Sequence, residues 1–257
     1  SLIHYDAEQC TVNGRVQGAS RETSMGIERH RDGSARARVN GDAAESLSDL
    51  AVLLPLVLID ADSLGLITGQ PEARRRFLDQ SVFHVEQSFI QHWRRYQRAL
   101  KQRNAGLRHG TLGAFDPWAD EVVAAGELIN AARERTLALL SARFCEAAAL
   151  LSDDIAGVSI RLRSGWDKTL SLREALDKSL LSDQTQGFTH VGPHRADLRV
   201  SCDGRPASEV MSRGQLKLTV AALKLAQGQL LSEVGQGRPV FLVDDLAAEL
   251  DARHLRR

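Results

Sequence analysis

Two long stretches in the middle of the chain carry apolar residues at helical spacing. The first covers 84–107, and the second begins after a turn at 110–113 and an Asp-Pro pair. Spacings of three and four residues place such side chains on one face of a helix. The first face comprises Phe89, Trp93, Tyr96 or Gln97, Leu100, Asn104 and Leu107, and the second Val122, Ala125, Ile129, Ala132, Thr136, Leu139, Phe144 and Leu151. We therefore predict an antiparallel helical hairpin that buries both faces.

Alternating apolar and polar residues predict strands before and after this hairpin. Residues 1–45 alternate in runs separated by Asp-Gly and Asn-Gly turn dipeptides, so an antiparallel meander is expected there. Residues 158–163 alternate as a further strand, and 198–202 should pair with a short return strand across another Asp-Gly turn.

Two short runs, 52–59 and 239–243, are apolar throughout. Such runs are typical of buried strands in a parallel sheet. A short helix is expected from Leu170 to about Leu181, since Ser171 and Glu174 form a capping-box pattern at its start.

The net charge is uninformative, but the local distribution of charge is not. The chain carries 33 Lys and Arg against 33 Asp and Glu, so any contact with nucleic acid must come from a local basic face. The first predicted helix offers one on the side opposite its apolar stripe. Its members are Arg94, Arg95, Arg98, Lys101, Arg103 and Arg108. They would contact DNA phosphates or form a solvated helix face; the sequence leaves both interpretations open.

Cysteine usage and hydropathy bear on the compartment. Cys10, Cys145 and Cys202 are far apart and lack metal-ligand spacing, which favours a reduced, cytoplasmic protein. The longest apolar run, 50–59, is too short to cross a bilayer and contains Pro55. No signal peptide is recognisable, and no membrane association is expected.

The stretch from 210 to 251 carries the candidate chemistry. Ser212-Arg213-Gly214-Gln215 opens a predicted helix, where a hydroxyl, free backbone N–H groups and the helix dipole together favour a phosphate. Asp244-Asp245 ends the following strand, and paired carboxylates in such a place need a cation, usually Mg²⁺. Each feature alone would more often be a helix cap or a surface turn; their fixed order favours nucleotide chemistry.

These motifs resemble those of ABC-type ATPase heads. Residues 212–215 resemble the signature motif, 241–245 the Walker B strand, and 247–251 the D-loop. The Ser-Arg-Gly-Gln and Asp-Asp variants are similar to the RecF family of bacterial recombination mediators, as are Gly192-Pro193-His194-Arg195-Ala196-Asp197-Leu198 and the G-x-P-x-x-R-R-x-F-L-D block at 69–79. Within that block, Arg74-Arg75-Arg76 would form either a salt-bridged lobe junction or a phosphate site.

The resemblance implies an α/β fold of the ABC/SMC ATPase-head type, with a mixed β lobe, a parallel-sheet core and an inserted α-helical hairpin lobe. Residues 1–70 would form the β-rich part of lobe I. Residues 71–185 would form the mostly helical lobe II, and 186–257 the signature helix, Walker B strand and D-loop. Asp62 would occupy the place of the Q-loop, although the usual preceding Pro is replaced by Ala61.

The resemblance also implies roles for individual residues. Two subunits would dimerise around ATP, with Ser212, Arg213, Gly214, Gln215 and Asp251 touching nucleotide or the other subunit across the interface. Asp244 would hold Mg²⁺. Asp245 would orient the attacking water, and as an Asp in place of the usual Glu it would give slow hydrolysis.

The implied partners are double- and single-stranded DNA at gap junctions, together with RecR and RecO in loading RecA. Candidate DNA-binding residues are Arg94, Arg95, Arg98, Lys101, Arg103, His194 and Arg195.

A P-loop motif occurs nowhere in the sequence. We therefore expect an internal fragment of a longer protein, inactive as an ATPase by itself, with open sheet edges that lower its solubility. Two alternatives to a repair ATPase stay open: a non-enzymatic DNA-binding protein with a decayed ATPase core, and an SMC-like structural protein.

Overall fold

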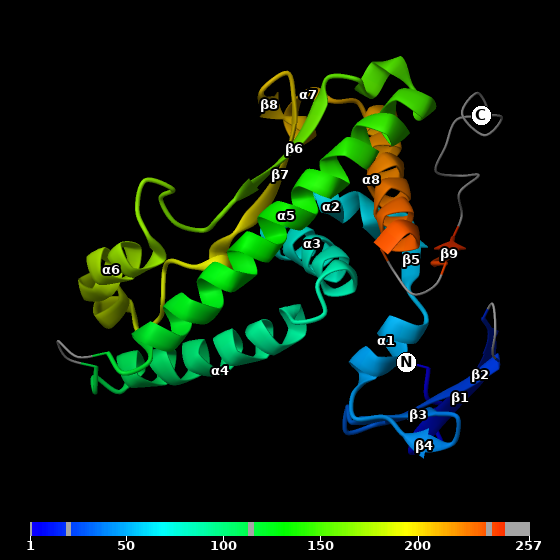
Figure 1. Ribbon diagram of the computed structural model, residues 1–257, viewed down its shortest axis with the longest axis horizontal. Helices are drawn as coiled ribbons and strands as arrows, with labels where there is room; N and C mark the ends of the chain where they lie inside the picture. The colour runs from blue at the N-terminus through cyan, green and yellow to red at the C-terminus, as the bar shows by residue number, and fades with distance from the viewer. Residues whose placement is uncertain (1, 19–21, 113–115, 235–237, 245–257) are drawn as a thin grey trace.

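The computed structural model describes residues 2–18, 22–112, 116–234 and 238–244, in which a small β-sheet leads into a larger helical body (Figure 1). The sheet contains β1 (Gln9–Gln17), β2 (Glu22–His30), β3 (Ala35–Val39) and β4 (Asp42–Ala43), all antiparallel and in sequential order. The predicted meander is thereby confirmed. The turn residues Gly33, Asn40 and Gly41 have φ of 86°, 51° and 93°, as these hairpins require.

A parallel strand pair follows. Helix α1 (Leu47–Leu53) precedes β5 (Leu56–Ile59), which pairs in parallel with β9 (Val240–Val243). The prediction of a buried strand over 52–59 is wrong in two respects. Its first residues belong to α1, which begins at a Ser46–Asp49 capping box and ends before Pro55.

Burial of the parallel pair is also only partial, with Val57 of β5 at 1% exposure. Leu56 and Leu58 are exposed, and so is every residue of β9. Among the described residues the pair forms a sheet of only two strands, against which α8 (Arg213–Val234) packs. Phe241 lies so close to Gly228 of α8 that a β-carbon at position 228 would stand 2.1 Å from the ring.

The helical body is built on α5 (Ala119–Leu151), which packs against α4 (Phe89–Arg108), α3 (Pro71–Val85), α6 (Leu172–Gln186) and α8. The predicted antiparallel hairpin of α4 and α5 is confirmed (Figure 1). Leu139 of the predicted stripe is exposed, however, whereas Leu140 is fully buried. The buried face shifts because α5 packs against α4 and against α8 at different points along its length.

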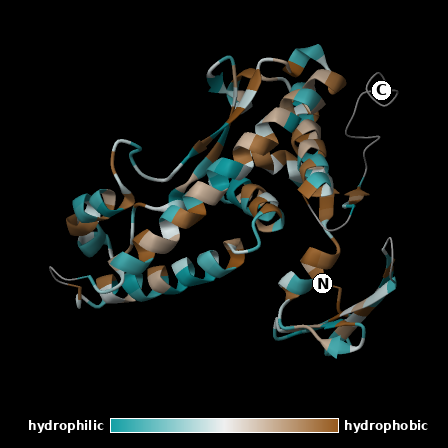
Figure 2. Ribbon diagram, in the orientation of Figure 1, coloured by the Kyte–Doolittle hydropathy of each residue, from teal (hydrophilic) through white to brown (hydrophobic). Residues whose placement is uncertain are grey.

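Hydrophobic residues concentrate where α5 meets α8, whereas α4 is mostly hydrophilic (Figure 2). The buried core at this junction includes Ile129, Leu140 and Phe144 of α5 and Leu223 and Leu230 of α8.

A second antiparallel sheet lies beside α5. Its strands β6 (Val158–Arg163), β7 (Asp197–Cys202) and β8 (Arg205–Pro206) confirm the predicted strand and hairpin. Helix α6 begins at the predicted Ser171–Glu174 capping box and continues past the predicted end to Gly187, whose φ of 76° terminates it. Short helices α2 (Gly65–Thr68) and α7 (Ala207–Val210) and the 3-10 turns η1 (Ala61–Leu64), η2 (Asp153–Ile155) and η3 (Pro193–Arg195) complete the connections.

Candidate nucleotide and DNA sites

The signature segment forms the exposed N-terminus of α8. The Ser212 backbone N–H donates to Oε1 of Gln215 at 2.8 Å, and the Gln215 N–H donates to Ser212 Oγ at 3.3 Å, which makes a reciprocal capping box. Ser212, Arg213 and Gly214 are exposed. A β-carbon on Gly214 would meet nothing within 4 Å, so a ligand has free access to this turn.

Asp244 lies at the C-terminal end of the parallel pair. Its backbone N–H donates to the Ile59 carbonyl at 2.9 Å, and the residue is exposed. Because β5 and β9 are parallel, the residues after both strands share one edge, and Asp60 and Asp62 follow β5 there. Asp245 and Asp251, predicted as the catalytic and D-loop residues, lie outside the described residues. No cluster of three or more His, Cys, Asp or Glu suited to a metal occurs in the part of the chain that the structure describes.

Within one chain the signature segment and the strand end are well separated. Burial lowers the pKa of the Lys224 amine of α8, and the charge of Asp60 opposes this shift, so Lys224 lies near the end of β5. Twelve residues separate Ser212 from Lys224, which corresponds to about 18 Å along a helix.

The outer side of α4 carries the predicted basic face. Arg94, Arg95, Arg98 and Lys101 are all exposed. Arg95 is partly neutralised, because its guanidinium donates to Glu121 of α5 at 2.7 and 2.9 Å and the carboxylate raises the pKa of the arginine.

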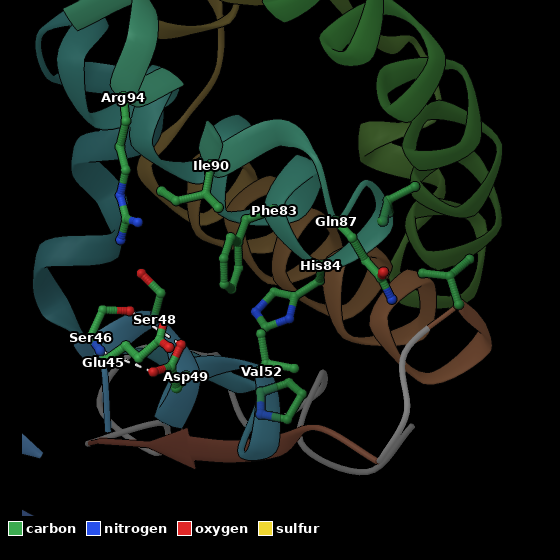
Figure 3. Close-up of a pocket in the computed structure, with 13 residues that line it drawn as sticks. Glu45, Ser46, Ser48, Asp49, Val52, Phe83, His84, Gln87, Ile90 and Arg94 are labelled. Atoms are coloured by element: carbon green, nitrogen blue, oxygen red, sulfur yellow. Dashed lines mark hydrogen bonds between the residues drawn. The ribbon is translucent and has the colours of Figure 1, made fainter. Parts of the chain in front are cut away.

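Arg94 lies at one end of a cavity of about 460 Å³ between α1 and the α3–α4 junction. Figure 3 shows its side chain pointing into this cavity, toward the segment that carries Glu45 and Asp49. Arg108, at the end of α4, is the fifth exposed member of the predicted face. Of these five cations, Arg98, Lys101 and Arg108 are therefore the most free to meet an external phosphate: none of them lines this cavity or has an ion pair in the described chain.

Arg103 does not belong to the exposed face, and its placement there is wrong. Its side chain is 1% exposed and bonds Asp116 at 2.6 Å, Asp183 at 2.7 Å and Thr189 at 2.7 Å. These partners come from three different segments, and they turn the side chain inward.

His194 is also turned inward. Its Nδ1 accepts from the Tyr96 hydroxyl at 2.6 Å, and its Nε2 donates to the Thr189 carbonyl at 3.0 Å, so both ring nitrogens are occupied by protein groups. Burial lowers the pKa of His194 to about 4, which leaves the ring neutral at pH 7. Its neighbour Arg195 is exposed, with its guanidinium over the Phe188 ring at 5.2 Å.

The arginine run of the 69–79 block forms a salt-bridged junction, the first of the two interpretations. Arg74 donates to Asp197 at 2.7 Å and to the Gly69 carbonyl at 2.8 Å, and Arg75 donates to the Ala196 carbonyl at 2.8 Å. Arg76 pairs with Glu72 on the surface of α3. The block thus ties α3 to the start of β7.

Comparison with known proteins places this arrangement in a family. The chain is 44% identical over 258 residues to the DNA replication and repair protein RecF of Pseudomonas entomophila (strain L48), an alignment that covers 99% of this chain and 70% of the relative. The corresponding protein of Stutzerimonas stutzeri (strain A1501) is 43% identical over 257 residues, with 98% and 69% covered. The chain belongs to the RecF family.

Solved RecF structures show the same fold. The structure described as RecF-ATP in the RecFOR pathway superimposes with a TM-score of 0.88 at 24% identity and covers 99% of this chain and 72% of its own. A second, described as RecF-ATPrS, gives a TM-score of 0.84 at 23% identity, with 97% and 71% covered. The predicted ATPase-head fold class is thereby confirmed. No protein-family model matches the chain. None of the described helices is long and apolar enough to cross a membrane.

Sequence reasoning missed one residue that organises this RecF-family fold. Arg133 of α5 is fully buried and donates to Asp79 of α3 at 2.7 and 2.9 Å and to the Pro193 carbonyl at 2.7 Å. It joins the 69–79 block to the 192–198 block, two motifs that the resemblance had singled out. The sequence spacing could have predicted this burial, because Arg133 is four residues after the apolar Ile129 and so lies on the same buried stripe of the helix.

The neutral state of His194 makes stability depend on pH. The pKa is about 4 in the folded protein and near 6.5 in the unfolded chain, so the unfolded state binds more protons between these values. The free energy of unfolding should therefore fall as the pH drops below about 6.5, by about 2 kcal/mol at pH 5. Urea titrations at pH 7.5 and 5.0 measure this loss. His194→Gln should flatten it; an unchanged pH dependence in that variant would assign the effect to another group, such as His84, whose pKa burial also lowers.

Proposed function

We propose that this RecF-family protein binds DNA under the control of ATP, with two subunits closing around the nucleotide. The observation that carries the proposal is the exposed, unobstructed turn at Ser212 and Gly214, about 18 Å along α8 from the level of the strand end. The turn would supply one half of a nucleotide site, and the strand end that would supply the other half is distant in the same chain. A site shared by two subunits has this arrangement.

The residues present suit the phosphates of ATP. Opening the Ser212–Gln215 capping box would free a hydroxyl and a side-chain amide at a helix N-terminus, where the dipole favours negative charge. Arg213 adds a cation that is exposed at the same turn. Solved structures with the same fold are described as RecF-ATP and RecF-ATPrS.

Asp244 is the described residue that would hold Mg²⁺, which supplies charge neutralisation on the β- and γ-phosphates when bound. An exposed carboxylate at the end of a parallel strand suits this role. Asp245 would orient the attacking water and Asp251 would cross the subunit interface; both assignments rest on the family motif.

DNA would meet α4. Arg94, Arg98 and Lys101 present exposed cations on one helix, and such groups bind phosphates without reading sequence. Arg195 would add a further cation. RecO and RecR, and RecA loading at single-strand gaps, are the partners and outcome that family membership suggests.

Light scattering of the full-length protein with and without ATP–Mg²⁺ tests the switch. We expect ATP to double the mass of the wild-type protein and to leave Ser212→Arg monomeric, because the arginine would block the γ-phosphate turn. Ser232→Arg is the matched control, since Ser232 is exposed near the other end of the same helix. Dimerisation of Ser212→Arg would refute the proposed role of the turn. If ATP never changes the mass while DNA still binds, the chain is a constitutive DNA-binding module.

A further inference from the structure

A groove on the far side of α5 from α4 has no assigned role. The outer face of β6 and β7 forms its floor, and α2 and α3 contribute to its wall, around a space of about 470 Å³. The lining residues that matter are Ser159, Arg161, Arg199, Ser201 and Ser208, with Arg74 and Asp197 at one end.

Two like charges lie opposite each other in this floor. Arg161 of β6 pairs directly with Arg199 of β7 in the antiparallel register, and both residues are exposed. Directly opposed like charges destabilise a strand pair. The adjacent pairs avoid this arrangement, since Arg163 is opposite Asp197 and Ser159 is opposite Ser201. Neither Arg161 nor Arg199 forms an ion pair with any part of the chain that the structure describes.

The groove therefore has a net positive charge that nothing in the described chain offsets. Three guanidinium groups line it, from Arg74, Arg161 and Arg199, against one carboxylate, from Asp197. Asp197 is already bonded to Arg74 at 2.7 Å and 3.2 Å, so it does not shield the other two. An anion that bridged Arg161 and Arg199 would convert a repulsive pair into an attractive site.

Hydroxyl groups continue the site along the floor. Ser159 Oγ and Ser201 Oγ are 3.2 Å apart, beside the arginine pair, and Ser208 lines the same groove. Arginine and serine side chains are typical ligands of nucleic-acid phosphates. None of the described residues that line the groove is aromatic, so bases would find no stacking platform there.

We propose that this groove binds the phosphodiester backbone of single-stranded DNA, as a contact separate from the basic face of α4. The proposal rests on the proposed function, because it assigns the second DNA segment of a gap. The two unpaired guanidinium groups and the serine hydroxyls beside them can contact consecutive phosphates of one strand. Because α5 packs against both α4 and β6, the two contacts lie on different faces (Figure 1).

Fluorescence anisotropy of the full-length protein with a labelled oligothymidylate and a blunt hairpin duplex, in the presence of ATP–Mg²⁺, tests this proposal. Arg161→Ala/Arg199→Ala should weaken binding of the single strand about tenfold and reduce its log–log salt slope by about 1.4, the value for two phosphate contacts. Binding of the duplex should change less than twofold. Arg161→Lys/Arg199→Lys should retain most of the affinity, and Lys178→Ala, at an exposed position on α6, should change nothing.

Folding and the proposed function are checked separately. The thermal midpoint of the double alanine variant should be equal to or above that of the wild type, since the substitution removes a repulsive pair. Arg94→Ala/Arg98→Ala/Lys101→Ala should weaken duplex binding and so reports on α4 alone.

Two results would overturn the groove proposal: unchanged single-strand binding in the double alanine variant, or equal losses on both DNAs. If duplex binding also survives the α4 substitutions, the proposed function fails as well.

Discussion

Replacing Arg103 with methionine should lower the free energy of unfolding by about 3–5 kcal/mol, the cost of leaving a buried charge without its partner. The guanidinium is 1% exposed, and the Asp183 side chain that it contacts is 0% exposed. Methionine fills a similar volume, so the loss reports on charge rather than on a cavity.

The size of the effect follows from the hydrogen bonds that the Asp183 carboxylate retains after the substitution. Its Oδ1 still accepts from the backbone N–H and Nδ1 of His190, at 3.0 and 2.7 Å. Its Oδ2 would retain only the Ser179 hydroxyl at 3.2 Å. Thr189 would lose the same partner, although its hydroxyl still contacts Asn104 at 2.7 Å. A carboxylate in a dry site with one oxygen poorly satisfied is costly.

Urea unfolding at pH 7.5 measures the change, with Lys101→Met as control. Lys101 is exposed on the same helix, and its substitution should stay within about 0.5 kcal/mol of the wild type. Adding Asp183→Asn to Arg103→Met should recover part of the loss, because the remaining partner is then neutral. A loss below about 1 kcal/mol for Arg103→Met would contradict this account and would mean that water reaches Asp183.

Arg103 also shows where sequence reasoning stops. Helical spacing correctly placed α4 and its apolar stripe, but spacing cannot tell an exposed arginine from one whose partners are 13 and 80 residues away. His194 is a similar case, since its burial depends on Tyr96, which is 98 residues distant. Long-range polar pairs are set by the tertiary fold, and no local pattern encodes them.

Sequence patterns predicted the structure correctly where the interactions join residues that are close in the sequence. The capping box at Ser171 and the Asp-Gly and Asn-Gly turns were read correctly, because the hydrogen bonds involved span a few residues. The apolar run at 52–59 predicted a strand that is too long, because an apolar run does not distinguish the end of a helix, where Val52 and Leu53 lie, from the start of a strand. Motif order placed Ser212 at an exposed helix start and Asp244 at a strand end, as the structure has them, while their roles stay predictions.

Gly165 should tolerate no side chain, and Gly165→Ala is expected to cost about 3 kcal/mol or more from combined backbone strain and steric overlap. Its φ is 92°, and a β-carbon there would stand 2.2 Å from the Gly192 carbonyl oxygen and 2.7 Å from the Ala196 nitrogen. Both are backbone atoms, so no side chain can rotate away.

Gly204→Ala separates the two causes, because Gly204 has a similar φ of 80° but open space around its β-carbon. It should cost only about 1 kcal/mol, the strain of a left-handed residue. Denaturation followed by tryptophan fluorescence compares the two variants, and equal losses would mean that the contact with Gly192 is unimportant. A larger loss for Gly165→Ala would show that close backbone packing holds η3 in place. Since His194 of η3 bonds Tyr96 of α4 and Arg195 follows it in the same turn, this variant should also weaken DNA binding if Arg195 meets phosphate.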